Sequence, residues 1–240
     1  MTFEICETNF LLNEEVAKNK LLNSVTANDY GGYSVALNAE KIIRMYSDED
    51  FCEIIQNAKF TVYDGVACKF WLDWWQTASS HDMRKVDFPD LALKIADTEA
   101  IRVGVFAGRK QNVSILAQRL KAEYPNINFD FIEHGFHTTG ELQDILLRHD
   151  VQFCFLGLGS PLQERLAAEL ARFYPNTNFL CVGGAFDIKL GIKRRAPEYI
   201  VHSNYEWLYR LVQEPKRLLR YIKILRIFIV ILRFPVTLKS

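Results

Sequence analysis

The chain has 240 residues, of which 49% are hydrophobic and 13% aromatic, so it has enough apolar side chains for a packed core and is not a disordered protein. Its 29 basic and 29 acidic side chains give a formal net charge of zero. The five cysteines are widely spaced and form no C-x-x-C pair, so neither a zinc ribbon nor a disulfide framework is indicated, and buried thiols in a reducing cytoplasm are the simplest interpretation. Met1–Asn13 lacks a basic region followed by an apolar run, so no signal peptide is expected.

The first hundred residues contain both helix and strand patterns. We expect three helices, at Glu14–Ser24, Asp48–Ala58 and Val66–Trp75. We expect two strands, at Tyr33–Leu37 and Lys59–Tyr63. Asn13 and Ser47 are suitable N-caps for the first two helices, because their side-chain oxygens can accept a hydrogen bond from a free N–H of the first turn. His81–Asp90 is expected to be a loop.

From Ile101 onward the chain alternates between short apolar strands and amphipathic helices. The expected strands are Ile101–Ala107, Asn128–Ile132, Val151–Gly157 and Asn178–Val182. The expected helices are Gln111–Glu123, Glu141–Arg148 and Leu162–Phe173. Alternation at this spacing is typical of βαβ units in a parallel sheet. The sequence therefore predicts an α/β, Rossmann-like fold, with a mostly parallel sheet that carries helices on both faces.

Two segments of the chain, 50 residues apart, resemble each other. Leu116–Phe129 reads LAQRLKAEYPNINF and Leu166–Phe179 reads LAAELARFYPNTNF. Each is predicted to be a helix, then Tyr-Pro-Asn, then a strand, because proline stops a helix and asparagine supports a turn. Two similar βαβ halves fit a Rossmann-like layout, although shared turn chemistry alone could also produce this similarity.

The predicted strand that ends at Gly157 is followed by a glycine-rich turn, Gly-Leu-Gly-Ser-Pro-Leu-Gln-Glu. Gly157 and Gly159 permit a tight turn and a close approach of the backbone to a ligand. Ser160 is expected to be the N-cap of the next helix, with Pro161 in its first position and Gln163 completing a capping box. Free N–H groups at such a helix start bind phosphates at the carboxyl edge of a sheet. A turn without a ligand is the alternative, and because the pattern is neither G-x-G-x-x-G nor a Walker loop, neither NAD nor ATP is indicated.

Asp64-Gly65 follows another predicted strand, so it is also expected at the carboxyl edge of the sheet. A carboxylate in that place can act as a general base toward a hydroxyl group. A turn aspartate before a glycine, without a catalytic role, is the simpler alternative.

Three other groups of residues have simpler explanations than catalysis. Asp48-Glu-Asp50 has the D-x-D spacing of metal-dependent sugar transferases, but acids at a helix start stabilise the helix macrodipole. His134 and His137 have no third histidine or cysteine nearby, which favours a surface loop over a metal site. Three tryptophans recur at helical spacing and are more typical of a core than of a sugar-stacking platform: Trp71, Trp74 and Trp75.

The last 26 residues, Pro215–Ser240, contain seven basic side chains and no acid. Because the whole chain is neutral, the preceding 214 residues carry a net charge of −7. Between Leu218 and Leu232 apolar residues recur on one helical face and basic residues lie on the other, as in an in-plane interfacial helix. The longest uncharged run has six residues, Ile227–Leu232, whereas a spanning helix needs roughly 20. We expect this tail to contact an anionic membrane surface; a helix packed on the core or on another subunit is the alternative.

Several short segments occur in one specific order along the chain. They are Asn38-Ala-Glu40, Asp64-Gly65, Gly157–Glu164, Gly183–Asp187, Arg195-Ala-Pro197, Glu206–Arg210, and Glu214–Arg217 with Arg220. Together they resemble the WecG/TagA/CpsF family of bacterial glycosyltransferases, from about Tyr33 to Arg220. The resemblance implies a Rossmann-like core with a C-terminal appendage that meets the membrane. It also implies transfer of a sugar from a UDP-sugar to an undecaprenyl-diphosphate-linked sugar, with inversion and without a required metal.

By this resemblance Asp64 is the candidate catalytic base. The candidate substrate-binding residues of the core are Asn38, Gly157, Gly159, Ser160, Gln163, Glu164, Asp187 and Arg195. Those of the appendage, which would meet the diphosphate, are Arg210, Arg217 and Arg220. Two places depart from the family pattern. The first is Ala36, which stands where the family often has threonine, so that a hydroxyl contact is lost or is supplied by a neighbour such as Ser34. The second is Lys85–Asp90, which lacks a glycine of the corresponding family segment.

The proposed chemistry is coherent without the resemblance. Displacing UDP requires a base for the acceptor hydroxyl, and Asp64 can serve. It also requires stabilisation of the departing diphosphate, which a helix N-terminus and arginines can supply. Together with the resemblance, which implies surface-polysaccharide assembly, this chemistry leads us to expect a glycosyltransferase that acts on the cytoplasmic face of the cell membrane. Its core is expected to be residues 1–195 and its helical, membrane-docking appendage residues 196–240.

The expected partners are a UDP-sugar donor, a polyprenyl-diphosphate-linked sugar acceptor and the anionic membrane surface. The donor sugar is expected to be an N-acetylhexosamine, its uronic acid or a hexose. No cofactor, metal or nucleic acid is expected, and the oligomeric state stays open, a homo-oligomer included. Two alternatives remain: an NAD(P)-dependent oxidoreductase, and a non-catalytic membrane-docked partner of polysaccharide assembly enzymes.

Overall fold

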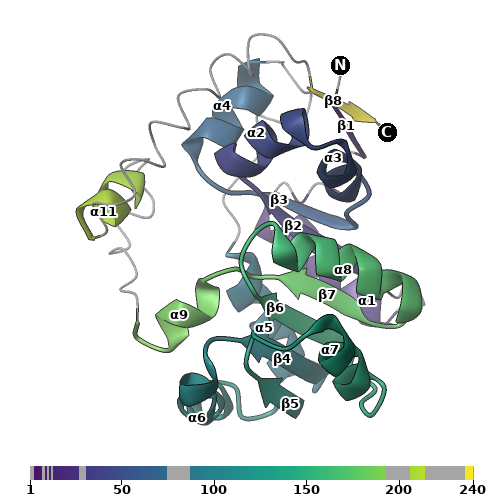
Figure 1. Cartoon of the computed structure of the whole chain (residues 1–240), viewed down its shortest axis with the longest axis vertical. Helices are drawn as coiled ribbons and strands as arrows, with labels where there is room; N and C mark the ends of the chain where they lie inside the picture. The colour runs from purple at the N-terminus through teal and green to yellow at the C-terminus, as the bar shows by residue number, and fades with distance from the viewer. Residues whose placement is uncertain are drawn as a thin grey trace.

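Six strands form the central sheet, and all of them are parallel (Figure 1). The computed structural model describes residues 3–6, 9, 11, 13–26, 31–74, 87–192, 206–213 and 236–239. The strands are β2 (Gly32–Leu37), β3 (Phe60–Tyr63), β4 (Arg102–Ala107), β5 (Asn128–Glu133), β6 (Phe153–Gly157) and β7 (Asn178–Cys181). They stand in the order β3-β2-β7-β6-β4-β5. The predicted α/β, Rossmann-like fold is confirmed.

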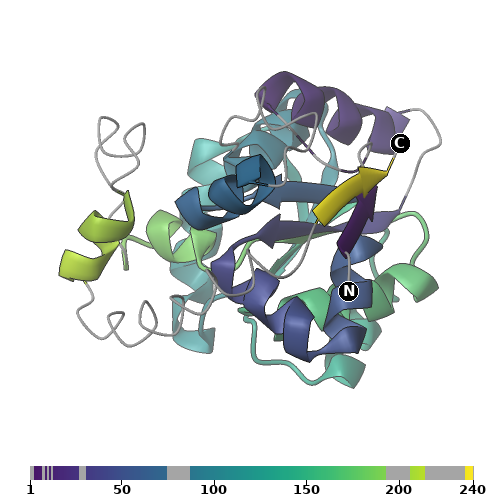
Figure 2. The ribbon, with the colours of Figure 1, turned by 90° about the horizontal axis from the view of Figure 1, so that it is seen from above.

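Helices cover both faces of this sheet (Figure 2). One face carries α2 (Ala39–Ser47), α3 (Glu49–Gln56), α7 (Thr139–Leu146) and α8 (Leu162–Phe173). The other face carries α1 (Glu14–Thr26), α5 (Phe88–Thr98), α6 (Val113–Glu123) and α9 (Ala185–Lys189). Successive strand residues point to opposite faces, so Cys154 and Leu156 pack in the first core and Phe153 and Phe155 in the second. Because both faces are buried, the strands inside the sheet, such as β4 and β6, are mostly apolar in sequence.

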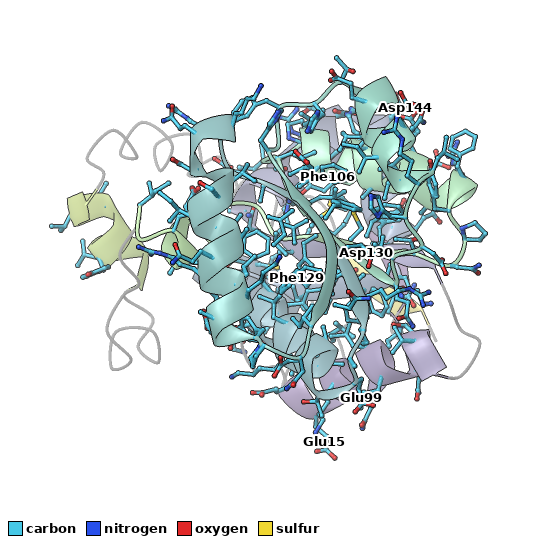
Figure 3. All side chains as sticks on the ribbon, turned by 90° about the horizontal axis from the view of Figure 1, so that it is seen from below. Glu15, Glu99, Phe106, Phe129, Asp130 and Asp144 are labelled. Carbon is cyan, nitrogen blue, oxygen red and sulfur yellow. The ribbon has the colours of Figure 1, made fainter. Side chains whose placement is uncertain are left out.

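The edge strand β5 has one extra residue where it pairs with β4. Phe129 and Phe131 pair with consecutive β4 residues, so that Asp130 between them is bulged. The bulge changes the side-chain alternation. Phe129 packs in the core on the α6 side (Figure 3), while Phe131 packs in the opposite core. The Phe131 ring lies directly over Gly104, where a Cβ would stand 2.2 Å from it, and its centroid is 4.8 Å from that of Phe106. Gly104 therefore gives the edge of the sheet its close packing.

The connections diverge between β4 and β6, in the middle of the sheet. From β4 the chain passes through α6 to β5 on one side, and from β6 it passes through α8 to β7 on the other. In open parallel sheets, ligands bind outside the carboxyl ends of the strands at such a switch point. The fold therefore directs attention to the loops that follow Ala107 and Gly157.

The internal sequence repeat corresponds to two equivalent helix-to-strand connections. Tyr124 and Tyr174 follow the last residues of α6 and α8, with φ and ψ of −130° and 76° in the first and −121° and 72° in the second. Their N–H groups donate to Leu120 and Leu170, at 2.8 and 2.9 Å. The predicted order of helix, Tyr-Pro-Asn turn and strand is confirmed in both copies.

Helix α1 begins as predicted, because the N–H of Val16 donates to Asn13 Oδ1 at 3.0 Å. The next helix start differs from the prediction. Helix α3 begins at Glu49 with Asp48 as its N-cap, whose Oδ1 accepts from the N–H of Phe51 at 3.0 Å. Ser47 cannot serve as this cap, since it is the last residue of α2.

Two helices of the N-terminal half were not anticipated. Helix α2 follows β2 directly, and its buried residues Ile42 and Met45 pack in the core. Helix α5 begins at Phe88, inside the stretch that we expected to be a loop, because Phe88 is an apolar anchor that is only 2% exposed. The rest of that expected loop, up to residue 86, lies outside the described residues. Helix α4 (Val66–Trp74) agrees with the prediction.

Two parts of the C-terminal region are described, α11 (Glu206–Gln213) and β8 (Val236–Lys239). β8 pairs in parallel with β1 (Phe3–Cys6), so the two ends of the chain lie side by side (Figure 1). The final residues of the expected helical appendage are thus a strand, which the β-branched Val236 and Thr237 favour. Residues 214–235, the main part of the expected basic helix, lie outside the described residues. No helix in the described part of the chain is long and apolar enough to cross a membrane.

Candidate functional site

The carboxyl ends of all six strands meet at one edge of the sheet, because the strands are parallel. Asp64 follows β3, Asn38 follows β2, Gly183 lies just after β7, and Gly157 ends β6. The structure therefore brings together, at one edge, candidate residues from four different strands. Adjacent strands are about 4.8 Å apart, so Asp64 and Gly157 are separated by three strand spacings, roughly 14 Å along the edge.

Asp64 is half-buried and directly precedes α4. Its N–H donates to the carbonyl of Leu37 at 2.7 Å, and the carbonyl of Gly65 accepts from the N–H of Cys68 at 3.2 Å. Burial, followed by the charge of Asp64, raises the pKa of the Cys68 thiol well above its usual range, so the thiol stays neutral. Within the described residues, the Asp64 carboxylate forms no ion pair and no side-chain hydrogen bond.

Asn38 is half-buried and is the N-cap of α2. Its Oδ1 accepts from the N–H of Lys41 at 3.2 Å. The cap uses the carbonyl end of the side chain and leaves the NH₂ end as a donor for a ligand. Its predicted role in the sugar or nucleotide pocket stays a prediction.

The glycine-rich turn depends on two glycines for different reasons. A Cβ on Gly157 would stand 2.9 Å from Ala107 Cβ and 3.1 Å from the carbonyl oxygen of Gly183, so only glycine permits this approach of the strands. Gly159 has φ of +83° and open space around it, so its conformation, not its surroundings, favours glycine. Ser160 is exposed.

The predicted cap of α8 is wrong. The helix begins at Leu162, Pro161 is the residue before it, and no side chain caps this end. Ser160 and Gln163 therefore form no capping box. The physical reason is that Gln163, only 3% exposed, turns inward and bonds to the end of β7: its Oε1 accepts from the N–H of Gly183 at 3.0 Å.

Glu164, the neighbour of Gln163, is completely buried. Its Oε1 accepts from Gln163 Nε2 at 2.9 Å and pairs with Lys41 Nζ, also at 2.9 Å. Lys41 Nζ donates in addition to the carbonyl of Ala36 at 2.6 Å. Sequence reasoning missed Lys41; the signal that was available is its place on the same helical face as Ala39, Ile42 and Met45, a face that must be buried.

Asp187 lies in α9, which follows β7. Its side chain is half-buried. The helix is held in place by Arg119, which donates to the carbonyl of Lys189 at 2.9 Å, and by Lys189, which donates to Asp90 at 3.2 Å and to the hydroxyl of Tyr124 at 2.7 Å. Asp187 is therefore presented at the carboxyl edge from a helix anchored to α5 and α6.

The side chains of four candidate arginines are not among those that the structure describes. Arg195, Arg217 and Arg220 lie outside the described residues, and Arg210 belongs to α11 but its side chain is not described. The backbone of α11 stands apart from the sheet, on the side of α9 (Figure 1). Their predicted roles stay predictions.

The simpler explanation is confirmed for Asp48 and for Trp71, but not for Trp74. Asp48 caps α3 and accepts two bonds from Arg165, at 2.9 and 2.7 Å. His134 and His137 stack with centroids 3.9 Å apart in the loop after β5. Within the described part of the chain, no three His, Cys, Asp or Glu side chains are grouped so as to hold a metal ion. Trp71 is fully buried, as expected of a core residue, whereas Trp74 is 50% exposed.

The departure at Ala36 is not compensated by the neighbouring serine. Ser34 is buried, and its hydroxyl accepts from the N–H of Cys181 at 2.9 Å. It faces β7 inside the sheet, so it does not supply a hydroxyl contact for a ligand.

A surface hollow of about 490 Å³ lies elsewhere, between α3 and α8. Tyr33, Asn57 and Arg172 line it, and they lie near the amino ends of the strands. Because the polar candidates and the switch point lie at the carboxyl edge, this hollow does not mark the candidate site.

The site is thus a carboxylate and an amide on one half of the carboxyl edge and a glycine-rich turn on the other. Residues 6–239 match the Glycosyl transferase WecG/TagA/CpsF family. The chain belongs to this family. A glycosyltransferase must bind a sugar donor and an acceptor, so these are the general substrates of this family.

Proposed function

We propose that this member of the WecG/TagA/CpsF family is an inverting glycosyltransferase that moves a sugar from a UDP-sugar to a polyprenyl-diphosphate-linked sugar. The observation that carries the proposal is the half-buried carboxylate of Asp64, which pairs with no side chain in the described part of the chain and lies at the same edge as the Gly157 turn, in a chain that matches this family over residues 6–239. The donor sugar would be an N-acetylhexosamine, its uronic acid or a hexose. The product would serve surface-polysaccharide biosynthesis.

The reaction needs a base on one side of the anomeric carbon and charge stabilisation for the diphosphate that leaves from the other side. In an inverting transfer, the acceptor hydroxyl attacks the anomeric carbon from the side opposite the leaving UDP. Asp64 would accept the hydroxyl proton. The diphosphate would lie toward the switch point between β4 and β6, where the N–H groups of the Gly157 turn and the start of α8 are the nearest donors. Asp64 and Gly157 are roughly 14 Å apart along this edge, which leaves room between them for the acceptor hydroxyl, the sugar and the diphosphate.

The C-terminal region would supply further positive charge and the membrane contact. The tail carries seven basic residues and no acid from Pro215 onward, and Arg210, Arg217 and Arg220 would meet the diphosphate. The protein would then work peripherally on the cytoplasmic face of the membrane, where a lipid-linked acceptor is presented. Activity and membrane docking would be coupled, because the same segment serves both.

The deciding experiment is a transfer assay on the full chain. A panel of UDP-sugars is incubated with a short polyprenyl-diphosphate sugar, and the product mass is read. We expect one donor to add a single glycosyl unit to the lipid. No product with any donor, together with no binding of UDP in a titration, would contradict the proposal. Binding of NADH in place of UDP would favour the oxidoreductase alternative, and neither binding nor transfer would favour a non-catalytic partner.

A further inference from the structure

A buried ion pair crosses the carboxyl edge and has no part in the chemistry described above. Lys41 Nζ lies 2.9 Å from Glu164 Oε1, and the two side chains are only 5% and 0% exposed. Lys41 stands at the start of α2, after β2, and Glu164 at the start of α8, after β6. β7 lies between these two strands, and both charges act on the buried thiol of Cys181 at its end. The pair therefore ties the two halves of the edge together.

Glu164 also determines the orientation of the Gln163 amide. Gln163 Nε2 donates to Glu164 Oε1 at 2.9 Å, and Gln163 Oε1 accepts from the N–H of Gly183 at 3.0 Å. An ionised carboxylate can only accept and a backbone N–H can only donate, so these partners select one of the two amide orientations. The chain of contacts thus runs from Lys41 through Glu164 and Gln163 to the main chain after β7.

We propose that Glu164 and Lys41 are positioning residues, whose ion pair holds Gln163, and through it the Gly183 backbone, in place for the nucleotide-sugar donor. This inference rests on the proposed function. Glu164 acts through Gln163 and does not touch the donor, because its side chain is completely buried. The resemblance implied that Glu164 binds the substrate. The geometry indicates instead that Glu164 holds the neighbouring Gln163 in position.

Charge balance explains why Lys41 is needed once Glu164 is present. A buried carboxylate without a countercharge is strongly unfavourable. Glu164 Oε2 has no hydrogen-bond partner within the described residues, so Lys41 is the main compensation for the charge. Replacing both members of a buried ion pair by apolar residues is, however, often neutral or stabilising. A purely structural pair and a positioning pair therefore behave differently when both members are replaced.

The test compares Lys41→Met, Glu164→Gln and the double variant Lys41→Met/Glu164→Leu. The matched control is Arg102→Met/Asp150→Leu, which removes an exposed ion pair of 2.6 Å at the opposite edge of the sheet. Three quantities are measured: the Tm, the turnover of the donor identified in the panel, and hydrogen–deuterium exchange at the Gly183 amide. Both single variants should lower the Tm and turnover. The double variant should recover the Tm, yet its turnover should stay about 10²-fold low, with faster exchange at Gly183.

The outcomes separate the two roles. Recovery of turnover together with the Tm in the double variant would show that the pair is structural only and would overturn the proposal. If the double variant does not fold, Glu164→Gln serves instead, because it keeps the size of the side chain. Wild-type turnover in folded Glu164→Gln would also overturn the proposal. Exchange at Gly183 needs no substrate: unchanged protection there overturns the positioning role by itself. Failure of the wild-type protein to bind UDP would instead contradict the proposed function.

Discussion

The main-chain N–H of Asp64 donates a 2.7 Å hydrogen bond to the carbonyl of Leu37. This bond lies at the carboxyl end of the ladder between β3 and β2, where Leu37 pairs with Tyr63. It places Asp64 beside Asn38, the residue after Leu37, as both leave the sheet. An acceptor group, the carboxylate, and an amide with a second group that can donate therefore leave the sheet at neighbouring positions, as the proposed transfer to a sugar hydroxyl would require.

Asp64→Asn should abolish transfer and leave the fold and donor binding intact. Asparagine has nearly the same shape but cannot take the acceptor proton, so we expect the transfer rate to fall by about 10²- to 10⁴-fold. The rate is measured with the lipid acceptor, and UDP affinity by titration calorimetry. Asp73→Asn, at an exposed position of α4 paired with Lys69, is the control and should keep its rate. An unchanged rate in Asp64→Asn would rule out its role as base.

The periodicity of the sequence was sufficient to predict the sheet and most of its helices. Strands buried on both faces are continuous apolar runs, and the helices between them repeat at 3.6 residues, so the βαβ order from Ile101 onward could be read directly. The segment Ala39–Ser47 was missed because Asn38 alone separates it from β2 and Asp48 alone separates it from α3. Boundaries of one residue without Gly or Pro give a weaker local signal than a longer turn does.

The contacts between distant elements could not be predicted, because a single sequence does not pair residues in space. Ser160, Pro161 and Gln163 match the local pattern of a capped helix start, yet the Gln163 side chain bonds to Gly183 instead. The hydrogen bond with Gly183, which is distant in sequence, thus replaces the local capping interaction of Gln163. Lys41 lies on the apolar face of α2, so its burial could have been predicted, but its partner Glu164 on another helix could not.

The two glycines of the turn after β6 should respond differently to alanine. Gly157→Ala forces a Cβ against Ala107 and the Gly183 carbonyl, so we expect a loss of about 1–3 kcal/mol in unfolding free energy and weaker UDP binding. Gly159→Ala meets no atom but must keep φ of +83°, which costs about 1–2 kcal/mol. Urea unfolding and UDP titration check both.

The control for these glycines is Gly140→Ala in α7, where a Cβ meets nothing and φ is ordinary. It should be neutral or slightly stabilising, because alanine is the better helix former. Equal UDP affinity in Gly157→Ala and Gly140→Ala would show that the backbone after β6 is not part of the donor site.

Neutralising basic residues of the tail should weaken membrane binding without removing the chemistry. Lys216, Lys223, Arg226 and Arg233 are changed to glutamine, which keeps the candidate Arg217 and Arg220. Each basic residue near an anionic surface contributes about 1 kcal/mol, so affinity for anionic vesicles should fall by about 10²- to 10³-fold. Substitution is preferable to truncation, because β8 pairs with β1.

The readouts for the tail are co-sedimentation with vesicles and transfer to a water-soluble acceptor analogue. Binding to vesicles of neutral lipid should be equally weak in both proteins. Undiminished binding of the substituted chain to anionic vesicles would favour the alternative that the tail packs on the core or on another subunit.

The free energy of unfolding should fall in acid, because protonation of Asp90 removes the negative charge that binds Lys189 of α9. Burial raises the pKa of Asp90, but hydrogen bonds from Lys94 and Tyr124 and the charge of Lys189 outweigh it and lower the pKa to about 2. The ionised form therefore favours the folded state by about 2 kcal/mol. Because the folded pKa lies below the unfolded value, this contribution is complete above about pH 4 and is lost as the pH falls through 2.

Asp90→Asn removes this contribution at every pH, so the difference in unfolding free energy between wild type and variant should shrink from pH 5 to pH 2. Urea unfolding across that range measures the difference, and a ¹³C titration of the carboxyl group gives the pKa directly. Asp150→Asn, whose side chain is 81% exposed, is the control and should show little change. Since Lys189 joins Asp90 to the helix that carries Asp187, Asp90→Asn should also weaken UDP binding if Asp187 contacts the donor. A pKa near the usual value for Asp90 would contradict this prediction, because it would mean that Lys94, Tyr124 and Lys189 do not bind the carboxylate in solution.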